Sequence, residues 1–378
     1  MNECIKVLLV TGSFGIGGLE TVAMNIVRYS DRKKFSFDFL VYGQEEYANE
    51  KEAIELGCRV FRVPFPHNTP FSFERNVREI IRNNGPYEVV HCHNLFNCGF
   101  VALAAYKEGV PVRISHCHTN RVNNKRSLIR VFYEWYMRML IKRYSTDFFA
   151  CSKDAASYLF GKDYINKTYI MRNGIDIDKF KFNPLLRDKY RKQFSLDDNS
   201  LVIGQIGTLR NVKNHKFSLE IFKKLKERSN TNNFKMFFIG DGELKEVIHK
   251  QIVQYGLDKD VVMLGLRTDI HNLLNMFDLY IMPSKYEGVS VALIEAQAAG
   301  LPCLVSETAC APEVIVSSQI ESAKLTDSID VWVDKIENNI RKKRCVNSAD
   351  IVRNSGYSIK SIIEKLDCKY LELLKMHK

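Results

Sequence analysis

Two glutamates flank a glycine turn and a helix start within residues 283–296. Glu287 precedes the turn, and Glu295 lies about one turn inside the helix that follows. The free N–H groups and the dipole of such a helix start favour an anion. The two carboxylates are suited to accept hydrogen bonds from pairs of sugar or ribose hydroxyls. The alternative is that Glu287 caps the helix and Glu295 is a solvated charge, and the spacing leaves both interpretations open.

Two cations follow the predicted strand 201–207, at the end of a strand where open α/β sheets bind their ligands. Arg210 and Lys213 are three positions apart. Such a pair can hold a diphosphate, because Arg offers a bidentate fork and Lys a point charge. As ordinary surface residues they would need no ligand.

Glycine-rich loops follow two other predicted strands. In residues 12–20 the pattern Gly15-x-Gly17 begins a dinucleotide fingerprint, but the third glycine falls at Gly18 instead of position 20. The loop is therefore better interpreted as one that lets the backbone approach a phosphate or a sugar. The loop that contains Gly240 has the same character. A plain tight turn is the alternative for both.

Two His-x-His pairs, His91 with His93 and His116 with His118, each end a predicted strand. Residues i and i+2 share one face of a strand, so four imidazoles could meet. We weigh three interpretations, which are a zinc site, a single histidine that touches a sugar hydroxyl or the reacting centre, and buried structural histidines. The sequence contains no P-loop and no Gly-x-Ser-x-Gly elbow, which argues against a P-loop NTPase and an α/β serine hydrolase.

These residues must be positioned by a chain of 378 residues, which is too long for one hydrophobic core and suits two domains. Short β-branched runs alternate with helical patterns in each half, which predicts an α/β fold with two Rossmann-like, doubly wound parallel sheets that face each other across a crevice. We place the domains at 1–185 and 186–356, with a terminal helix at 357–378 that crosses back onto the first domain. Ten cysteines without a Cys-x-x-Cys pair, and no apolar run of about 20 residues, indicate a reduced cytoplasmic protein that does not span a membrane.

The net charge of +11 is concentrated in the first half, where residues 1–198 carry 30 Lys and Arg against 22 Asp and Glu. The densest basic segment is 121–143, which includes a predicted helix at 126–144. Arg130, Glu134, Arg138 and Lys142 form a charged stripe, opposite an apolar side. The helix either packs into the first domain or docks on an anionic membrane surface, and the two are compatible if the basic stripe points outward.

With these residues in place, the chain resembles the retaining family-4 glycosyltransferases of the GT-B type, particularly those of bacterial capsules and exopolysaccharides. The main match is Glu287-x7-Glu295 within Pro-Ser-x-Tyr-Glu-Gly and Ile-Glu-Ala. Supporting motifs, in the family's order, are Gly17–Glu20, Val89–His93, Ala150–Ser152, Asn173–Asp176, Arg210 with Lys213-Asn214, and Gly240–Gly242. They cover nearly the whole chain.

The resemblance implies a nucleotide-sugar donor, with UDP as the first choice of nucleotide, held mainly by the second domain, and a lipid-linked or glycan acceptor on the first. Arg210 and Lys213 would hold the donor diphosphate, Glu295 the ribose and Glu287 the transferred sugar. Further donor contacts would come from the backbone of Ser290, Val291, Ala292, Leu266 and Arg267, and from the glycine loops at Gly17, Gly18 and Gly240. The family's catalytic-site histidine corresponds to His116 or His118.

The same resemblance implies sugar transfer with retention and without a metal or other cofactor, by a cytoplasmic protein that can attach peripherally to the inner face of the membrane. A UDP-sugar epimerase of the same fold is the runner-up. From other classes, the alternatives are a metal-binding protein built on the histidine pairs and a nucleic-acid-binding protein, and we expect no nucleic-acid partner.

Overall fold

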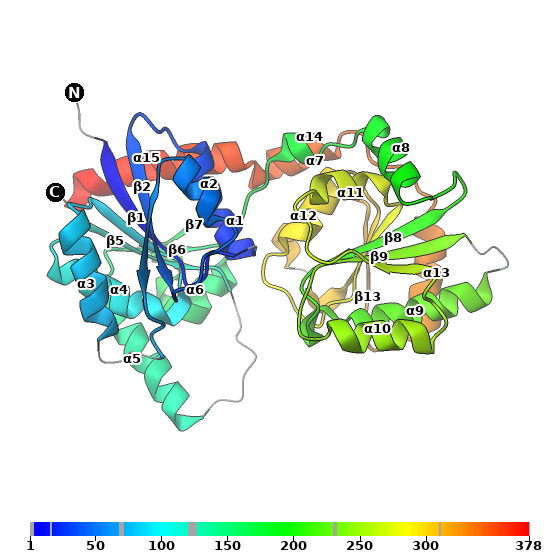
Figure 1. The fold of residues 1–378 in the computed structure, drawn as a ribbon, viewed down its shortest axis with the longest axis horizontal. Helices are drawn as coiled ribbons and strands as arrows, with labels where there is room; N and C mark the ends of the chain where they lie inside the picture. Colours follow the sequence, from blue (N-terminus) through cyan, green and yellow to red (C-terminus); the bar gives the residue numbers. More distant parts are fainter. Residues whose placement is uncertain are drawn as a thin grey trace. The chain divides into compact units, whose positions relative to one another are not determined.

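The computed structural model describes residues 4–15, 17–67, 72–119, 127–229, 233–309 and 311–377. The chain divides into two compact units. Unit 1 contains residues 1–174 and 359–378, and unit 2 contains residues 175–358. Figure 1 follows the chain by colour, and each unit is described by itself.

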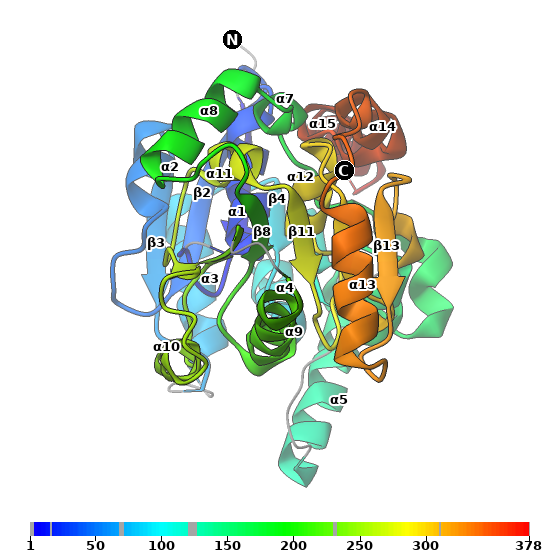
Figure 2. The same ribbon diagram turned by 90° about the vertical axis from the view of Figure 1, so that its right-hand side faces the viewer.

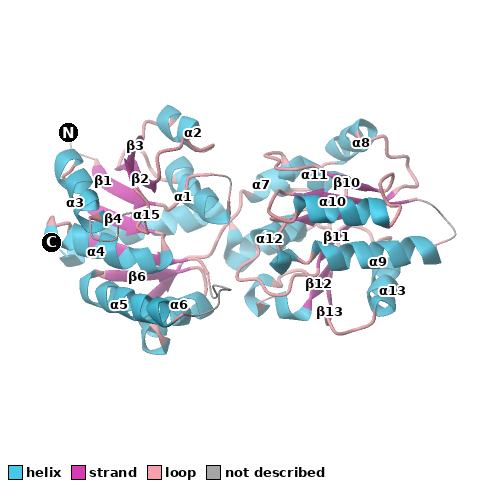
Figure 3. Cartoon of the chain, turned by 60° about the horizontal axis from the view of Figure 1, so that its bottom comes forward, coloured by secondary structure: helices cyan, strands magenta, loops and turns pink. Residues whose placement is uncertain are grey.

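Unit 1 is built on a seven-stranded parallel sheet with the strand order β3-β2-β1-β4-β5-β6-β7. Its strands are β1 (Ile5–Val10), β2 (Phe35–Tyr42), β3 (Arg59–Val63), β4 (Val89–Cys92), β5 (Val112–Cys117), β6 (Asp147–Ala150) and β7 (Thr168–Ile170). Apolar runs such as Val7 to Val10 are buried along their whole length because helices cover both faces of the sheet, as Figure 3 shows.

The helices of unit 1 are α1 (Gly18–Tyr29), α2 (Glu50–Glu55), α3 (Phe73–Asn84), α4 (Cys98–Lys107), α5 (Leu128–Tyr144), α6 (Lys153–Phe160) and the C-terminal α15 (Ile359–His377). Helix α15, red in Figure 1, runs along unit 1. Its buried side chains, including Ile363, Leu366 and Tyr370, join α1 and the sheet in one hydrophobic core.

Unit 2 contains a six-stranded parallel sheet with the order β10-β9-β8-β11-β12-β13. Its strands are β8 (Leu201–Ile206), β9 (Phe234–Ile239), β10 (Val261–Met263), β11 (Leu279–Met282), β12 (Cys303–Ser306) and β13 (Ile320–Ala323). Successive residues face opposite cores, since Val202 and Tyr280 belong to one hydrophobic cluster and Ile203 and Ile281 to the other.

The helices of unit 2 are α7 (Ile177–Phe180), α8 (Pro184–Gln193), α9 (His215–Arg228), α10 (Lys245–Gln254), α11 (Ile270–Met276), α12 (Val291–Ala298), α13 (Ile329–Asn339) and α14 (Ser348–Val352). As in unit 1, they lie on both faces of the sheet (Figures 2 and 3). The predicted α/β fold with two doubly wound parallel sheets is therefore confirmed.

In both sheets the strand order reverses beside the first strand of the unit. The reversal lies between β1 and β4 in unit 1 and between β8 and β11 in unit 2. Ligands of such sheets bind outside the carboxyl ends of the strands at this switch point, because the loops there diverge to opposite faces. The candidate residues can therefore be judged by whether they lie at these two places.

Candidate functional site

The two main motifs of the second half meet at the switch point of unit 2. The loop after β8 carries Arg210 and Lys213, and the loop after the neighbouring strand β11 carries Glu287. The loops are tied together by the backbone, where Lys285 N donates to Val212 O at 2.8 Å. Asn214 Nδ2 adds a hydrogen bond to Pro283 O at 3.1 Å.

The centre of this site is an ion pair between two residues predicted to bind the donor. Lys213 Nζ lies 2.7 Å from Glu287 Oε1, and both side chains are largely buried. The backbone carbonyl of Lys213 accepts a hydrogen bond of 2.8 Å from Gln205 Nε2, and Gln205 is in turn bonded to Ser218. Both the backbone carbonyl and the side-chain ammonium of Lys213 are therefore fixed, at the carboxyl ends of the strands.

Arg210 differs from Lys213 in being free. Its side chain is exposed and makes no hydrogen bond or ion pair with the residues that the structure describes. It begins the short 3-10 turn Asn211–Lys213, which ends at Asn214 in the left-handed conformation, with φ of 58°. The exposed guanidinium of Arg210 and the largely buried ammonium of Lys213 offer an anion two cations at different depths.

A close backbone approach shapes the floor of this site. Gly240 follows β9 with φ of 140°, and a Cβ there would collide with the carbonyl of Gly207. Gly207 N donates to Ile239 O at 2.9 Å, which brings the ends of β8 and β9 together. Glycine is required at position 240 by this contact, and the predicted phosphate or sugar approach would use the same small surface.

The first turn of α12 supplies the N–H groups that the sequence predicts. Ser290 is the N-cap residue, and its hydroxyl contacts Met282 Sδ at 3.3 Å instead of capping the helix. The N–H groups of Val291 and Ala292 therefore belong to a helix start without a side-chain cap. They remain suited to an anion.

Glu295 lies in the same helix and has no ion pair with the described residues. Removal from water raises the pKa of its carboxyl to about 8. A partly buried carboxyl without a cationic partner among the described residues favours the binding role over a solvated charge. Uncompensated burial is typical of carboxyls at functional sites.

The loop after β10 holds Leu266 and Arg267. Leu266 is exposed, whereas Arg267 is fixed by two hydrogen bonds of 2.8 and 2.7 Å to the carboxylate of Asp269. Gly240 N donates to Gly265 O at 2.9 Å, so this loop borders the site formed by β8 and β9. The expected role of Leu266 and Arg267 rests on their backbone, which this pairing leaves available.

The other predicted glycines lie in unit 1. Gly17 is the N-cap of α1 and Gly18 its first residue. Residue 16 lies outside the described residues. Glu20 folds back over the loop and accepts a hydrogen bond from Ser13 Oγ. A Cβ at Gly17 would collide with the Glu20 carboxylate, whereas Gly18 has open space on that side.

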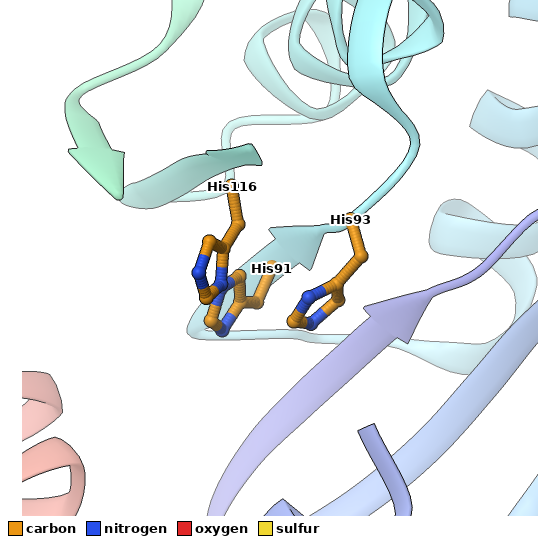
Figure 4. A group of neighbouring side chains, drawn as sticks. All are labelled: His91, His93 and His116. Carbon is orange, nitrogen blue, oxygen red and sulfur yellow. The ribbon is translucent and has the colours of Figure 1, made fainter. Parts of the chain in front are cut away.

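The four histidines do come together, as the two-residue spacing predicts. His91 Nε2 lies 3.0 Å from His116 Nδ1, and His93 Nδ1 lies 2.8 Å from His118 Nε2. His91 Nδ1 also bonds Tyr370 Oη of α15 at 2.7 Å. Figure 4 shows His91, His93 and His116 side by side at the ends of β4 and β5.

Burial keeps this histidine cluster neutral. Removal from water lowers the pKa of His91 to about 3 and that of His118 to about 4, and it also lowers the pKa values of His93 and His116. Ring nitrogens of His91, His93 and His116 lie within 4.8 Å of one another. However, the rings of His91 and His93 are stacked, with centroids 4.2 Å apart and planes only 26° from parallel. A zinc ion must lie in the plane of each ring at about 2.0–2.1 Å, so this arrangement does not suit one ion.

Helix α5 does not present its two sides in the way that membrane docking through its basic stripe requires. Glu134 is only 5% exposed and is bonded by Arg130 at 3.0 Å, so the part of the charged stripe around Glu134 faces the protein, whereas Lys142 at its end is exposed. The apolar side faces water instead, with Leu128 88%, Ile129 84% and Phe132 66% exposed. In Figures 1 and 2 the first turns of α5 extend beyond the rest of unit 1. The condition that the basic stripe points outward is therefore not met, and the part of the basic segment at 121–126 lies outside the described residues.

Sequence reasoning missed a cavity of about 690 Å³ at the switch point of unit 1. It lies between the first half of α5, the segment that follows β4, and the residues that follow β3, including Phe65. Nearly all of its accessible lining is apolar. Asn94 and Leu95 line it directly after His93, so the cavity adjoins the histidine cluster. No local pattern marks it, because its walls come from four separate segments.

No helix in the described parts of the chain is both long enough and apolar enough to cross a bilayer.

Comparison with known proteins gives a consistent result for both units. A family model described as "Glycosyltransferase Family 4" matches residues 16–179, and one described as "Glycosyl transferases group 1" matches residues 187–355. "Putative glycosyltransferase EpsF" of Bacillus subtilis (strain 168) is 37% identical over 345 residues, covering 89% of this chain and 88% of that protein.

A second relative is the "UDP-Gal:alpha-D-GlcNAc-diphosphoundecaprenol alpha-1,3-galactosyltransferase" of Escherichia coli, 26% identical over 76% of each chain. Among solved structures, Anabaena Alr3699/HepE in complex with UDP and glucose aligns with a TM-score of 0.77 and 18% identity, covering 98% of this chain and 100% of that one.

Proposed function

The chain belongs to the group 1, family 4 glycosyltransferases, which have the GT-B fold, and from that premise we propose that it transfers a sugar with retention from a UDP-sugar to a lipid-linked acceptor during synthesis of an exopolysaccharide or capsule. The E. coli relative, whose name specifies a UDP-Gal donor and a diphosphoundecaprenol acceptor, supports both substrate classes. We propose a cytoplasmic enzyme that divides the work between a donor-binding unit 2 and an acceptor-binding unit 1.

The observation that carries the proposal is the Lys213–Glu287 ion pair at the switch point of unit 2, beside the unpaired Arg210. The donor diphosphate would take Lys213 Nζ away from Glu287 and add the guanidinium of Arg210. The N–H groups at the start of α12 would complete the anion site. Glu287, released from the lysine, would accept hydrogen bonds from the transferred sugar, and Glu295 from the ribose.

The reaction follows from these charges. The bond between the anomeric carbon and the diphosphate oxygen breaks as the acceptor hydroxyl attacks on the same face. The departing diphosphate oxygen takes the hydroxyl proton, so no enzymic nucleophile is consumed. Lys213, Arg210 and the helix start stabilise the charge that develops on the leaving group, and the protein holds the acceptor hydroxyl beside the leaving group on that face. With these cations in place we propose that no divalent metal is required.

Between the two candidate histidines, we propose His118 as the one that contacts substrate. His116 is fully buried within β5 and bonded to His91, whereas His118 is partly exposed just beyond the end of that strand. A neutral imidazole there can hydrogen-bond a sugar hydroxyl.

We further propose that the enzyme docks on the inner face of the membrane through the outward apolar side of α5. A cluster of exposed large apolar side chains on one helix is typical of an interaction surface. The exposed Lys142 and Arg143 near the end of α5 add positive charge that an anionic bilayer would attract.

The first test is a thermal-shift comparison of UDP, GDP and ADP, each with excess EDTA. A ligand at about 100 times its Kd adds about 2.7 kcal/mol to the folded state. We expect UDP alone to raise Tm. If none of the three nucleotides raises Tm, or if UDP raises Tm only when a divalent metal replaces the EDTA, the donor site as proposed is wrong.

Lys213→Ala then tests the diphosphate clamp. Loss of one charge-stabilising group is expected to lower kcat by about two to three orders of magnitude, with a normal circular dichroism spectrum. Lys213→Gln removes the positive charge but keeps a side-chain amide that can donate a hydrogen bond to Glu287. Because the charge is what the diphosphate needs, we expect Lys213→Gln to be as impaired in kcat as Lys213→Ala. The exposed Lys216→Ala, on α9, is the matched control. Near-normal turnover of Lys213→Ala would overturn the assignment.

A further inference from the structure

We propose that the apolar cavity of unit 1, here called the tail groove, binds the hydrocarbon chain of the lipid-linked acceptor next to its polar head. The tail groove is the 690 Å³ cavity lined by Phe65, Leu95, Phe100, Ile129, Phe132 and neighbouring residues. The inference rests on the proposed function for the acceptor class, and it adds a binding subsite for one part of that acceptor.

The chemistry of the lining favours hydrocarbon. Its accessible surface is almost wholly apolar, and the Tyr133 hydroxyl at its wall is already used in a hydrogen bond to Asn97. A peptide in the groove would bring backbone N–H and C=O groups that need partners. An isoprenoid or alkyl chain brings none. The volume lies within the range of about 300–1,000 Å³ found for ligand pockets.

The position of the groove fits a chain whose polar end lies at the reacting centre. His93 N bonds Val10 O at 2.9 Å at the switch point, and Asn94, the next residue, lines the groove. A Cβ at Gly12 would lie 3.3 Å from Asn94 Oδ1, so the glycine loop after β1 lies beside the end of the groove that Asn94 lines. A head group held between this loop and the histidine cluster would pass its tail directly into the groove.

The opposite end of the groove reaches the outward face of α5. Ile129 and Phe132 line the groove and are also 84% and 66% exposed to water. The apolar surface is therefore continuous from the strand ends to the face that we propose lies on the bilayer. A membrane-anchored acceptor could keep its chain in apolar surroundings along this whole path, which a water-filled route would not allow.

Two double variants on α5 distinguish the contribution of the tail groove to acceptor binding from that of the outer face of the helix. I129N/F132N changes two exposed residues that line the groove, and L128N/W135N changes two residues of similar exposure that do not. Because all four side chains are more than half exposed, both variants should fold. Kinetics are measured on the full chain in detergent micelles with acceptors that carry the same sugar diphosphate on either a polyprenyl or a short alkyl chain.

We expect I129N/F132N to raise KM for the polyprenyl acceptor about tenfold or more, since a few methylene contacts suffice for that factor. Its KM values for the short-chain acceptor and for the donor should stay unchanged, whereas L128N/W135N, which changes only the proposed membrane-docking face, should keep the wild-type ratio of the two acceptor KM values. The tail groove would be overturned if the two variants changed the ratio of the acceptor KM values equally, or if the wild-type KM were the same for the polyprenyl and the short-chain acceptor. Either result would leave the proposed transfer reaction intact.

Binding of farnesyl diphosphate against inorganic diphosphate, measured by calorimetry, makes the groove testable even if neither acceptor is glycosylated. Tighter binding of the farnesyl compound that I129N/F132N abolishes would support the groove and refute only the proposed acceptor. Equal binding of the two probes would refute the groove. Light scattering tests whether a second copy of the chain occupies the groove instead. A wild-type dimer that I129N/F132N converts to a monomer would show this and would refute the hydrocarbon assignment.

Discussion

Glu295 shows how one partly buried carboxyl can impose a pH dependence on the protein. Its folded-state pKa of about 8 lies above the ordinary value of 4.5. Between these values the folded state binds more protons than the unfolded state, so this group's contribution to stability falls as pH rises through that window. It is fully present below the ordinary pKa and lost as pH rises through about 8.

Glu295→Gln, which cannot ionise, is therefore expected to melt at a higher temperature than the wild type at about pH 9 and at nearly the same temperature at about pH 5. Differential scanning calorimetry across that range measures the gap. Glu246→Gln, on the exposed face of α10, should show no gap that grows with pH. A constant difference for Glu295→Gln would contradict the raised pKa.

His118 leads to the opposite expectation for activity. Its pKa of about 4 means that the ring stays neutral over the physiological range. We expect His118→Ala to lower kcat about ten- to hundredfold through one lost hydrogen bond to the sugar, without changing the shape of the pH–rate profile between about pH 6 and 9. A wild-type titration step near neutrality that disappears in His118→Ala would show that the ring carries charge during turnover.

At the scale of the element, α5 shows what a helical pattern can and cannot predict. The pattern correctly indicated a charged side and an apolar side. It could not indicate which side packs inward, because that depends on partners far along the chain. Arg138 donates to the backbone carbonyl of Tyr158 at 2.9 Å, and the stripe around Glu134 is buried through contacts of this kind.

The outward apolar face predicts reversible membrane binding. L128N/W135N should lower the partition coefficient onto vesicles of phosphatidylglycerol and phosphatidylcholine, measured by co-sedimentation, by about a hundredfold or more, since each of the two apolar side chains contributes about 1.5–3 kcal/mol when buried. Arg75→Asn, an exposed change on α3, is the control. If the double variant sediments like the wild type, α5 does not anchor the protein.

Other elements follow the same logic. The apolar runs predict most of the strands, whereas β7 and β13 were not predicted, and these two lie at the edges of their sheets with few buried residues. The meeting of the Lys213 and Glu287 loops was predictable because parallel strands bring their carboxyl ends to one edge. Their ion pair and the burial of Glu295 were not, since both depend on side-chain distances that a sequence does not contain.

At the scale of the whole molecule, the two units differ in how the chain builds them. Unit 2 is one continuous segment, whereas unit 1 is interrupted at Gly174 and resumes at Ile359. Helix α15 contributes seven buried residues, which are Ile359, Ile362, Ile363, Leu366, Tyr370, Leu373 and Leu374. Tyr370 also holds His91. The first unit therefore has no complete core until the C-terminal helix has been made.

This arrangement predicts that the two units behave differently as fragments. At about 1.5–3 kcal/mol for each buried side chain, α15 contributes as much as the net stability of about 5–15 kcal/mol that a whole protein has. Residues 175–358 should fold alone and give a cooperative urea transition by circular dichroism, whereas residues 1–174 should not. Fusing residues 359–378 to residues 1–174 through a flexible linker should restore cooperative folding. The same fusion with Leu366 and Tyr370 changed to Asp is the control, since it keeps the length but not the core. Cooperative unfolding of residues 1–174 without the helix would show that α15 is only an accessory to the first sheet.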